Sequence, residues 1–195
     1  MKNFVEKQQK IMEETSKRHI FNSVVRITQK NNKIDFTMQH IADEAGMAIG
    51  TLYNYFENKS DLLIYVFRQL ITMNNERCDI VVSEPGNAEG RLQRFIIEFL
   101  RFGREYVIIF QIFDRTGLHS HIPEEEKEKN TNHTVEIVKK ILNDGIQEKV
   151  FRKMDTVMMA RILFTCMIGA IITEPLLNQF SLEKLSRELM RLFYL

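Results

Sequence analysis

The chain has 195 residues, 44% of them hydrophobic, which is enough apolar material for one compact domain or two small ones. Its formal net charge of +1 excludes a uniformly basic nucleic-acid coat protein, although residues 1–60 carry nine Lys and Arg against seven Asp and Glu. Cys78 and Cys166 lie far apart without metal-ligand spacing, so we expect reduced thiols in a cytoplasmic protein.

The sequence contains no segment that is typical of a leader or a membrane span. Residues 1–18 mix charges of both signs and lack a long apolar stretch, unlike a secretory signal. The most apolar late run, residues 158–177, is interrupted by Arg161, Glu174 and Pro175. We therefore expect no membrane partner.

Helical periodicity begins near the N-terminus. A first helix is predicted from about residue 5 to residue 29, with Ile20, Val24 and Ile27 forming its buried stripe. Thr37 is placed to cap a second helix through its hydroxyl group.

Residues 37–63 predict two short helices joined by a tight turn and followed at once by a third helix. Gly46 supplies the permissive backbone of the turn, while Leu52 and Phe56 lie four residues apart and face inward. This is the pattern of a helix-turn-helix, whose second helix fits a DNA major groove. The groups that this helix offers for outside contacts are Thr51, Tyr53, Asn54 and Tyr55. The alternative is that Tyr53 and Phe56 are core aromatics.

The motif Thr37-x3-Ile41-Ala42-x2-Ala45-Gly46-x3-Gly50-Thr51-Leu52-Tyr53-x-Tyr55-Phe56-x2-Lys59-x-x-Leu62 resembles the DNA-binding signature of the tetracycline-repressor (TetR) family. The resemblance covers residues 20–67. It implies an all-α fold with a three-helix helix-turn-helix DNA-binding domain at residues 1–60 and a ligand-binding and dimerisation bundle at 61–195. It places DNA contacts at Thr37, Ala48, Gly50, Thr51, Tyr53, Asn54, Tyr55 and Lys59.

Two positions depart from the family pattern. Ala48 stands where Ser or Thr is frequent, which removes a cap and a phosphate hydrogen bond. Ile49 stands where Lys or Arg is frequent, and it places an apolar group near the groove. We therefore expect phosphate contacts to depend more on Lys59, the tyrosines, and Lys17 and Arg18 of the first helix.

The remaining sequence predicts a helical bundle. Asn58 can cap a helix to about residue 82, and Pro123 with three following glutamates marks the start of another, which runs to about residue 147. Asp155 can cap a helix that Pro175 stops, and Ser181 opens the last one. Between the helix that ends near residue 82 and the helix that begins at Pro123, residues 91–102 are amphipathic and residues 106–113 are apolar almost all round.

The bundle is rich in Phe and Met, and Met adapts to ligands of varied shape. A pocket for a small apolar or aromatic effector is therefore expected, with core packing as the alternative for each residue. The candidate lining residues are Phe95, Phe99, Phe102, Phe110, Phe113, Met159 and Met167.

The last two helices carry a candidate dimer interface. Small groups recur at helical spacing in one of them, and Leu and Phe recur in the other, as in the four-helix dimer interface of the family. The residues are Cys166, Gly169, Ala170, Thr173, Leu182, Leu185, Leu189 and Phe193. The alternative is that the small stripe packs inside the monomer.

The resemblance implies a homodimeric repressor that leaves a palindromic double-stranded operator when its effector binds. The alternative is a DNA-binding protein of the same fold that acts through a protein partner without a small-molecule ligand. An enzyme is not favoured, because nucleophile, phosphate-loop and paired-carboxylate motifs are missing, and no cofactor is expected. A metal cluster of His119, His121 and nearby glutamates competes with an ordinary polar loop, which we prefer.

Overall fold

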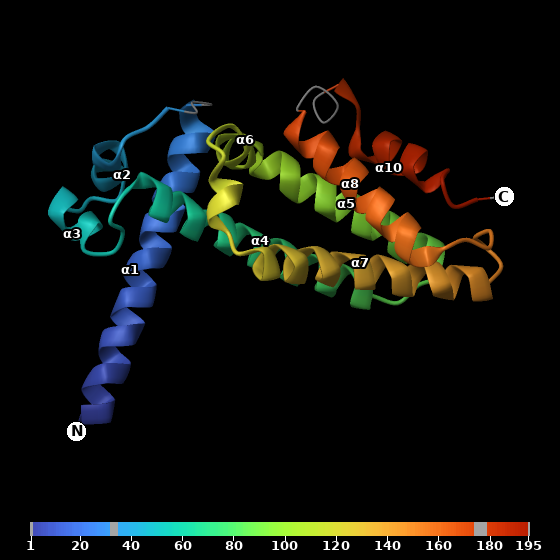
Figure 1. Cartoon of the computed structure of the whole chain (residues 1–195), viewed down its shortest axis with the longest axis horizontal. Helices are drawn as coiled ribbons and strands as arrows, with labels where there is room; N and C mark the ends of the chain where they lie inside the picture. Colours follow the sequence, from blue (N-terminus) through green and yellow to red (C-terminus); the bar gives the residue numbers. More distant parts are fainter. Residues whose placement is uncertain (1, 32–34, 174–178, 195) are drawn as a thin grey trace.

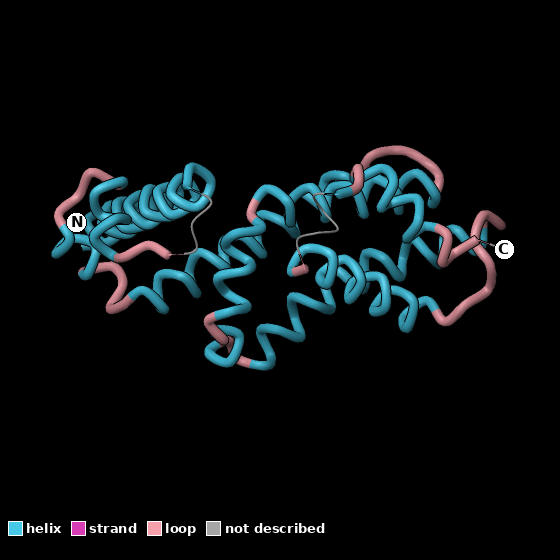
Figure 2. The backbone as a smooth tube through the Cα atoms, turned by 90° about the horizontal axis from the view of Figure 1, so that it is seen from above, coloured by secondary structure: helices cyan, strands magenta, loops and turns pink. Residues whose placement is uncertain are grey.

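The computed structural model describes residues 2–31, 35–173 and 179–194, and within these residues it contains helices and no strand. The predicted all-α class is confirmed. Figure 1 shows a small N-terminal head at one end and a helical bundle at the other, an arrangement also seen from above in Figure 2. The helices are α1 (Lys2–Asn31), α2 (Met38–Glu44), α3 (Ile49–Tyr53), α4 (Lys59–Ser83), α5 (Ala88–Glu105), α6 (Val107–Arg115), η1 (Leu118–His121), α7 (Glu124–Gln147), α8 (Thr156–Ile172) and α10 (Leu182–Met190).

The helix boundaries follow the predicted caps closely. The side chain of Asn58 accepts a hydrogen bond from the backbone N–H of Asp61, and Asp155 and Ser181 cap α8 and α10 in the same way. Pro123 is the cap residue of α7, so that helix begins one residue later than predicted. Pro175 lies outside the described residues.

The head consists of α1, α2, α3 and the start of α4. The predicted stripe of Ile20, Val24 and Ile27 is buried against the shorter helices. The N-terminal half of α1 extends well away from the rest of the molecule (Figure 1), and Ile11 and Met12 are exposed on it.

In the bundle, α5 lies at the centre and contacts α4, α7, α8 and α10. Its apolar side chains Leu92, Phe95 and Ile96 are fully buried. Among the described residues, no helix is both long and apolar enough to cross a membrane.

The core of the head continues into α6 and η1. Buried residues of α1 to α4 form one apolar cluster with Ile109, Ile112 and Phe113 of α6 and with Leu118 of η1. Because α4 also runs on into the bundle, the head and the bundle share α4 and are connected through α6. The division at residue 60 therefore remains a prediction that cuts across a continuous helix.

Candidate DNA-binding surface and ligand pocket

The helix-turn-helix forms as the sequence predicts. The Thr37 hydroxyl accepts a hydrogen bond from the backbone N–H of His40 at 3.2 Å, and the His40 ring accepts one from the N–H of Thr37 at 3.3 Å. Gly46 takes a φ of +62° in the turn, a conformation that favours glycine. Leu52 and Phe56 are buried beneath α3, which confirms that they face inward.

The outer face of α3 is open. Tyr53 is 48% exposed, so it is not a core aromatic, whereas Phe56 is one. A Cβ at Gly50 would meet no atom within 4 Å, and Ala48 precedes α3 without a side-chain cap. Of the predicted DNA contacts, Thr37, Ala48, Gly50, Thr51, Tyr53 and Asn54 are exposed, and Ile49, Tyr55 and Lys59 are half-buried. The structure thus gathers the predicted residues on and around one short helix, and their contact with DNA remains a prediction.

Lys59 has an additional role that the sequence did not indicate. Its ammonium donates a hydrogen bond to the carbonyl oxygen of Phe36 and lies 4.4 Å from the centre of the Phe36 ring. Through these two contacts, the cation holds the start of α4 against the segment before α2. Of the other cations expected on phosphate, Lys17 forms an ion pair with Glu13 at 2.6 Å, and Arg18 is exposed.

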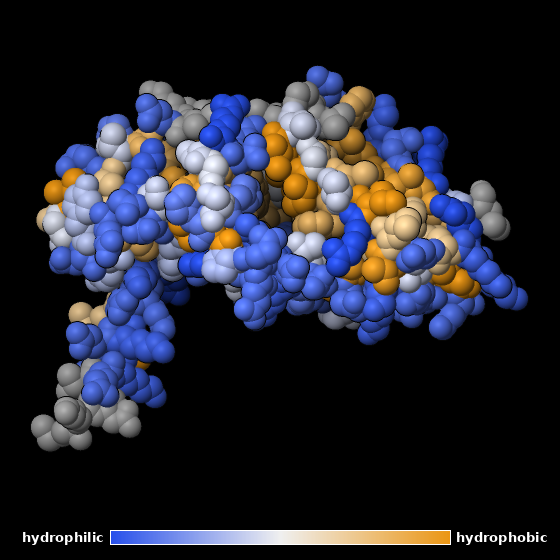
Figure 3. Space-filling model, in the orientation of Figure 1, coloured by the Kyte–Doolittle hydropathy of each residue, from blue (hydrophilic) through white to orange (hydrophobic). Residues whose placement is uncertain are grey.

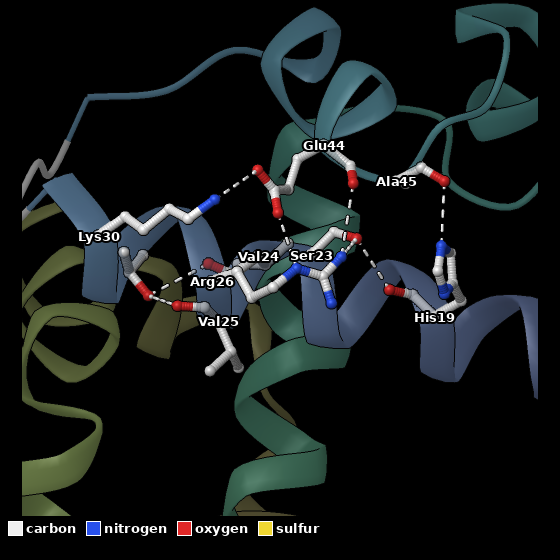
Figure 4. Close-up of polar contacts among 9 residues, drawn as sticks. His19, Ser23, Val24, Val25, Arg26, Lys30, Glu44 and Ala45 are labelled. Atoms are coloured by element: carbon white, nitrogen blue, oxygen red, sulfur yellow. Dashed lines mark hydrogen bonds and ion pairs between the residues drawn. The ribbon is translucent and has the colours of Figure 1, made fainter.

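A polar network attaches α2 and its turn to α1 (Figure 4). Arg26 donates to a carboxylate oxygen of Glu44 at 2.7 Å, and Lys30 approaches the other carboxylate oxygen at 3.8 Å. The hydrogen bond from Arg26 lowers the pKa of Glu44. Arg26 also donates to the hydroxyl of the buried Ser23 at 2.7 Å, which fixes the guanidinium against α1.

One hydrogen bond of this network reaches the turn itself. The His19 ring donates to the backbone carbonyl of Ala45 at 3.0 Å (Figure 4). Ala45 directly precedes Gly46, so His19 holds the end of α2 from which α3 departs. The pattern of one sequence does not reveal these long-range pairs, because each joins residues 18 or 26 positions apart.

The bundle contains two adjoining chambers that share a wall. The inner chamber has a volume of about 80 Å³ and the outer one about 250 Å³. In the space-filling view, apolar side chains gather in a hollow between the regions where Figure 1 draws η1 and α8 (Figure 3). The residues that line both chambers are Phe67, Ile71, Asn74, Phe99, His119 and Ile168.

Three of the seven predicted pocket residues, Phe99, Phe102 and Phe110, line the chambers. Phe95 and Met167 are fully buried in the bundle core instead. Phe113 stacks on Phe67 at 3.9 Å between ring centres, and Met159 packs against the bundle core. The structure thus places these four residues in the core and not in a chamber wall.

Helix α4 also contributes to the pocket, which was not predicted from the sequence. Phe67, Ile71 and Asn74 follow one another at helical spacing, which is the signal that could have found them. His119 of η1 completes this wall, with its ring edge-on to Phe113 at 4.6 Å. Burial lowers the pKa of His119, which favours the neutral ring. In the described part of the chain, no three His, Cys, Asp or Glu side chains are placed to hold a metal.

The candidate dimer interface divides into buried and exposed parts. Phe193, Leu182 and Ala170 are buried within the monomer, Phe193 completely, so their side chains are not presented to a partner. Cys166 and Thr173 are exposed, and Gly169, Leu185 and Leu189 are half-buried. Met158 and Ile162 are also exposed on α8, at 59% and 41%, and Figure 3 shows apolar atoms over this helix.

Comparisons with known proteins agree with this architecture. Residues 34–66 match the family described as "Bacterial regulatory proteins, tetR family". The fatty acid metabolism regulator protein of Bacillus subtilis (strain 168) is 26% identical over 179 residues, which cover 89% of this chain and 91% of that protein.

Solved structures share the fold over nearly the whole chain. A TetR transcription regulator from Haloarcula marismortui ATCC 43049 matches with a TM-score of 0.73 and 21% identity, covering 93% of this chain and 100% of that one. The transcriptional regulator FadR from Bacillus subtilis in complex with stearoyl-CoA matches with a TM-score of 0.67 and 24% identity, covering 90% and 96%. Residues 34–66 thus match the DNA-binding segment of the tetR family, and the chain as a whole shares the fold of solved TetR regulators.

Proposed function

We propose that this protein is a homodimeric repressor that a fatty acyl thioester releases from its operator. The observation that carries the proposal is the position of the two chambers. Their walls include Phe67 of α4, Phe110 of α6 and His119 of η1, and these elements also form part of the core of the DNA-binding head. The similar fatty acid metabolism regulator and the FadR complex with stearoyl-CoA support an acyl ligand.

The size of the chambers supports a coupling between ligand and DNA. Drug-sized ligands occupy pockets of roughly 300–1,000 Å³, whereas the inner chamber here has about 80 Å³. A long acyl chain in the inner chamber is therefore proposed to displace part of its wall, which includes α4 and α6, and both of these helices also pack in the head. A ligand that binds the displaced state more tightly than the DNA-competent state lowers operator affinity by that difference.

Release by an acyl thioester is tested with an operator that the protein itself selects from random duplex DNA. Stearoyl-CoA is expected to release this operator, whereas coenzyme A without an acyl chain is not. Equal DNA affinity with and without stearoyl-CoA, together with no binding of the thioester, would contradict the proposal. That result would favour the alternative that a protein partner controls DNA binding.

The dimer is proposed to form through the exposed apolar face of α8 and the half-buried leucines of α10. Two recognition helices must reach half-sites about 34–36 Å apart, which a two-fold pair of heads allows. Changing Ile162 to Lys would bury a charge in this interface and is expected to yield monomers in sedimentation experiments. The matched control is Ile80→Lys, at a 64% exposed isoleucine of α4, which should leave the dimer intact.

Thiol labelling provides an independent check of the interface. Cys166 lies exposed on α8, whereas Cys78 is buried and burial raises its pKa to about 12. Alkylation near neutral pH should therefore modify Cys166 alone, slowly in the dimer and faster in the Ile162→Lys variant. Equal rates in the two proteins would place the interface elsewhere.

A further inference from the structure

Asn74 is a polar side chain at the junction of the two chambers. It is 7% exposed and lines both the inner and the outer chamber. Apart from Asn74 and His119, the described side chains around the inner chamber are apolar, and Gly103 contributes none. An amide in such surroundings is unfavourable unless its hydrogen bonds are made.

The contact with Cys78 orients this amide. The Cys78 thiol, one turn further along α4, donates to the side-chain oxygen of Asn74 at 3.9 Å. Burial raises the pKa of Cys78 and keeps its thiol protonated, so the thiol can donate to the amide oxygen, which is a stronger acceptor than sulfur. The NH2 group of Asn74 has no hydrogen-bond partner among the residues that the structure describes. This NH2 group is thus free to donate to a molecule bound in the chambers that Asn74 lines.

The outer chamber contains polar side chains that the inner chamber lacks. These are Lys127, Asn130, Thr131 and Thr134 of α7 and Asn75 of α4, and they line the chamber together with the apolar Ile122 and Phe164. Lys127 pairs with Glu124 at 3.0 Å and is partly exposed. Asn74 thus lies where the apolar inner chamber meets the outer chamber, whose lining includes these polar groups and a cation.

We infer that Asn74 recognises the carbonyl oxygen of an acyl ligand whose chain lies in the inner chamber and whose polar head lies between α4 and α7. The order of groups in the site matches the order in such a molecule, which runs from alkyl chain to carbonyl to polar head. The inference rests on the proposed function, because it concerns how the protein recognises the acyl ligand. It makes Asn74 a specificity-determining residue, which separates acyl compounds from other amphiphiles of equal chain length.

The test uses two probes that differ in the carbonyl oxygen alone. Dodecanoyl-coenzyme A is a thioester, and S-dodecyl-coenzyme A is a thioether with the same chain and head. Calorimetry on the full-length protein should show the thioester binding about fivefold to tenfold more tightly, as expected for one hydrogen bond to an unpaired donor. In Asn74→Leu this preference should disappear while the thioether binds at least as well as before.

A matched change outside the chambers provides the control. Asn143→Leu, at an exposed position of α7, should keep the preference of the unchanged protein. If Asn74→Leu does not fold, Asn74→Ala makes the same comparison without adding volume.

Three outcomes distinguish a wrong role for Asn74 from wrong carbonyl recognition and from a wrong acyl ligand. Equal preference in the unchanged protein and in the Asn74 variant would overturn the role of Asn74, while binding of both probes would leave the proposed acyl function standing. The absence of any preference in the unchanged protein would overturn carbonyl recognition altogether. If neither probe binds, the acyl ligand itself is wrong, and the inference falls with it.

Discussion

The guanidinium of Arg68 in α4 makes a two-point contact with the carboxylate of Glu126 in α7, at 2.8 and 2.7 Å. The pair joins the helix that enters the head to α7, which also lines the outer chamber. The hydrogen bonds from Arg68 lower the pKa of Glu126 and those to Glu126 raise the pKa of Arg68. The charge pair therefore ties α4 to α7, and both helices line the outer chamber.

Replacing Glu126 by Gln is expected to lower the free energy of unfolding by only about 0.5 kcal/mol, because both side chains are partly exposed to screening solvent. Urea denaturation measures this change. The control is Glu136→Gln, whose partner Lys139 lies on the same helix at 2.8 Å, and its loss should be smaller still. A larger loss at Glu136 than at Glu126 would contradict a tie between helices.

The same pair predicts a pH dependence. The folded-state pKa of Glu126 lies below its ordinary value of 4.5, so the unfolded state binds protons first as the pH falls. The contribution of the pair to stability is thus fully present above about pH 5 and is lost as the pH falls through the lowered pKa. The difference in unfolding free energy between the unchanged protein and Glu126→Gln should shrink over that range.

Changing His19 to Ala should weaken operator binding without altering its dependence on salt. The ring of His19 holds the carbonyl of Ala45 at the turn, so its loss releases α3 but removes no phosphate contact. One lost hydrogen bond corresponds to about fivefold in affinity. A titration of DNA binding against salt concentration measures both quantities, and a flatter salt slope would indicate that His19 contacts DNA directly.

Changing Lys59 to Met separates two roles of this residue. If its contacts with Phe36 are its main role, the variant loses about 1 kcal/mol of stability. Its DNA affinity then falls, while the dependence of that affinity on salt concentration is unchanged. If Lys59 contacts phosphate, as the family resemblance implies, the salt slope decreases by about one. Because the ammonium is already bonded within the head, we expect the first outcome.

Changing Gly103 to Ala should both destabilise the protein and disturb the inner chamber. An added Cβ would lie 2.3 Å from two atoms of the buried Ile171, so that side chain must move. Overpacking of this kind costs about 1–3 kcal/mol. The control is Gly169→Ala, where the Cβ meets nothing within 4 Å and the better helix former should stabilise the monomer by about 0.5–1 kcal/mol. Both are compared in the Ile162→Lys background, so that dimer formation does not vary.

The sequence by itself determined the helices, their caps and the helix-turn-helix. The hydroxyl of Thr37 bonds the N–H of a residue three positions on, and Asn58 does the same, so these signals lie within one helical turn. The burial of Leu52 and Phe56 agrees with their four-residue spacing, although α3 ends at Tyr53 and Phe56 follows it. Such features are local, and a single sequence displays them directly.

Only the tertiary structure decided which apolar residues line a cavity and which fill the core. Phe95 and Phe99 share a helix and a residue type, yet Phe99 alone borders the chambers, because α4, α6 and η1 leave space beside it. The sequence likewise placed Phe193 on a dimer face, whereas the fold buries it against Phe151. Cavities and shared interfaces depend on how separate helices meet, and helical periodicity specifies a buried face without naming its neighbour.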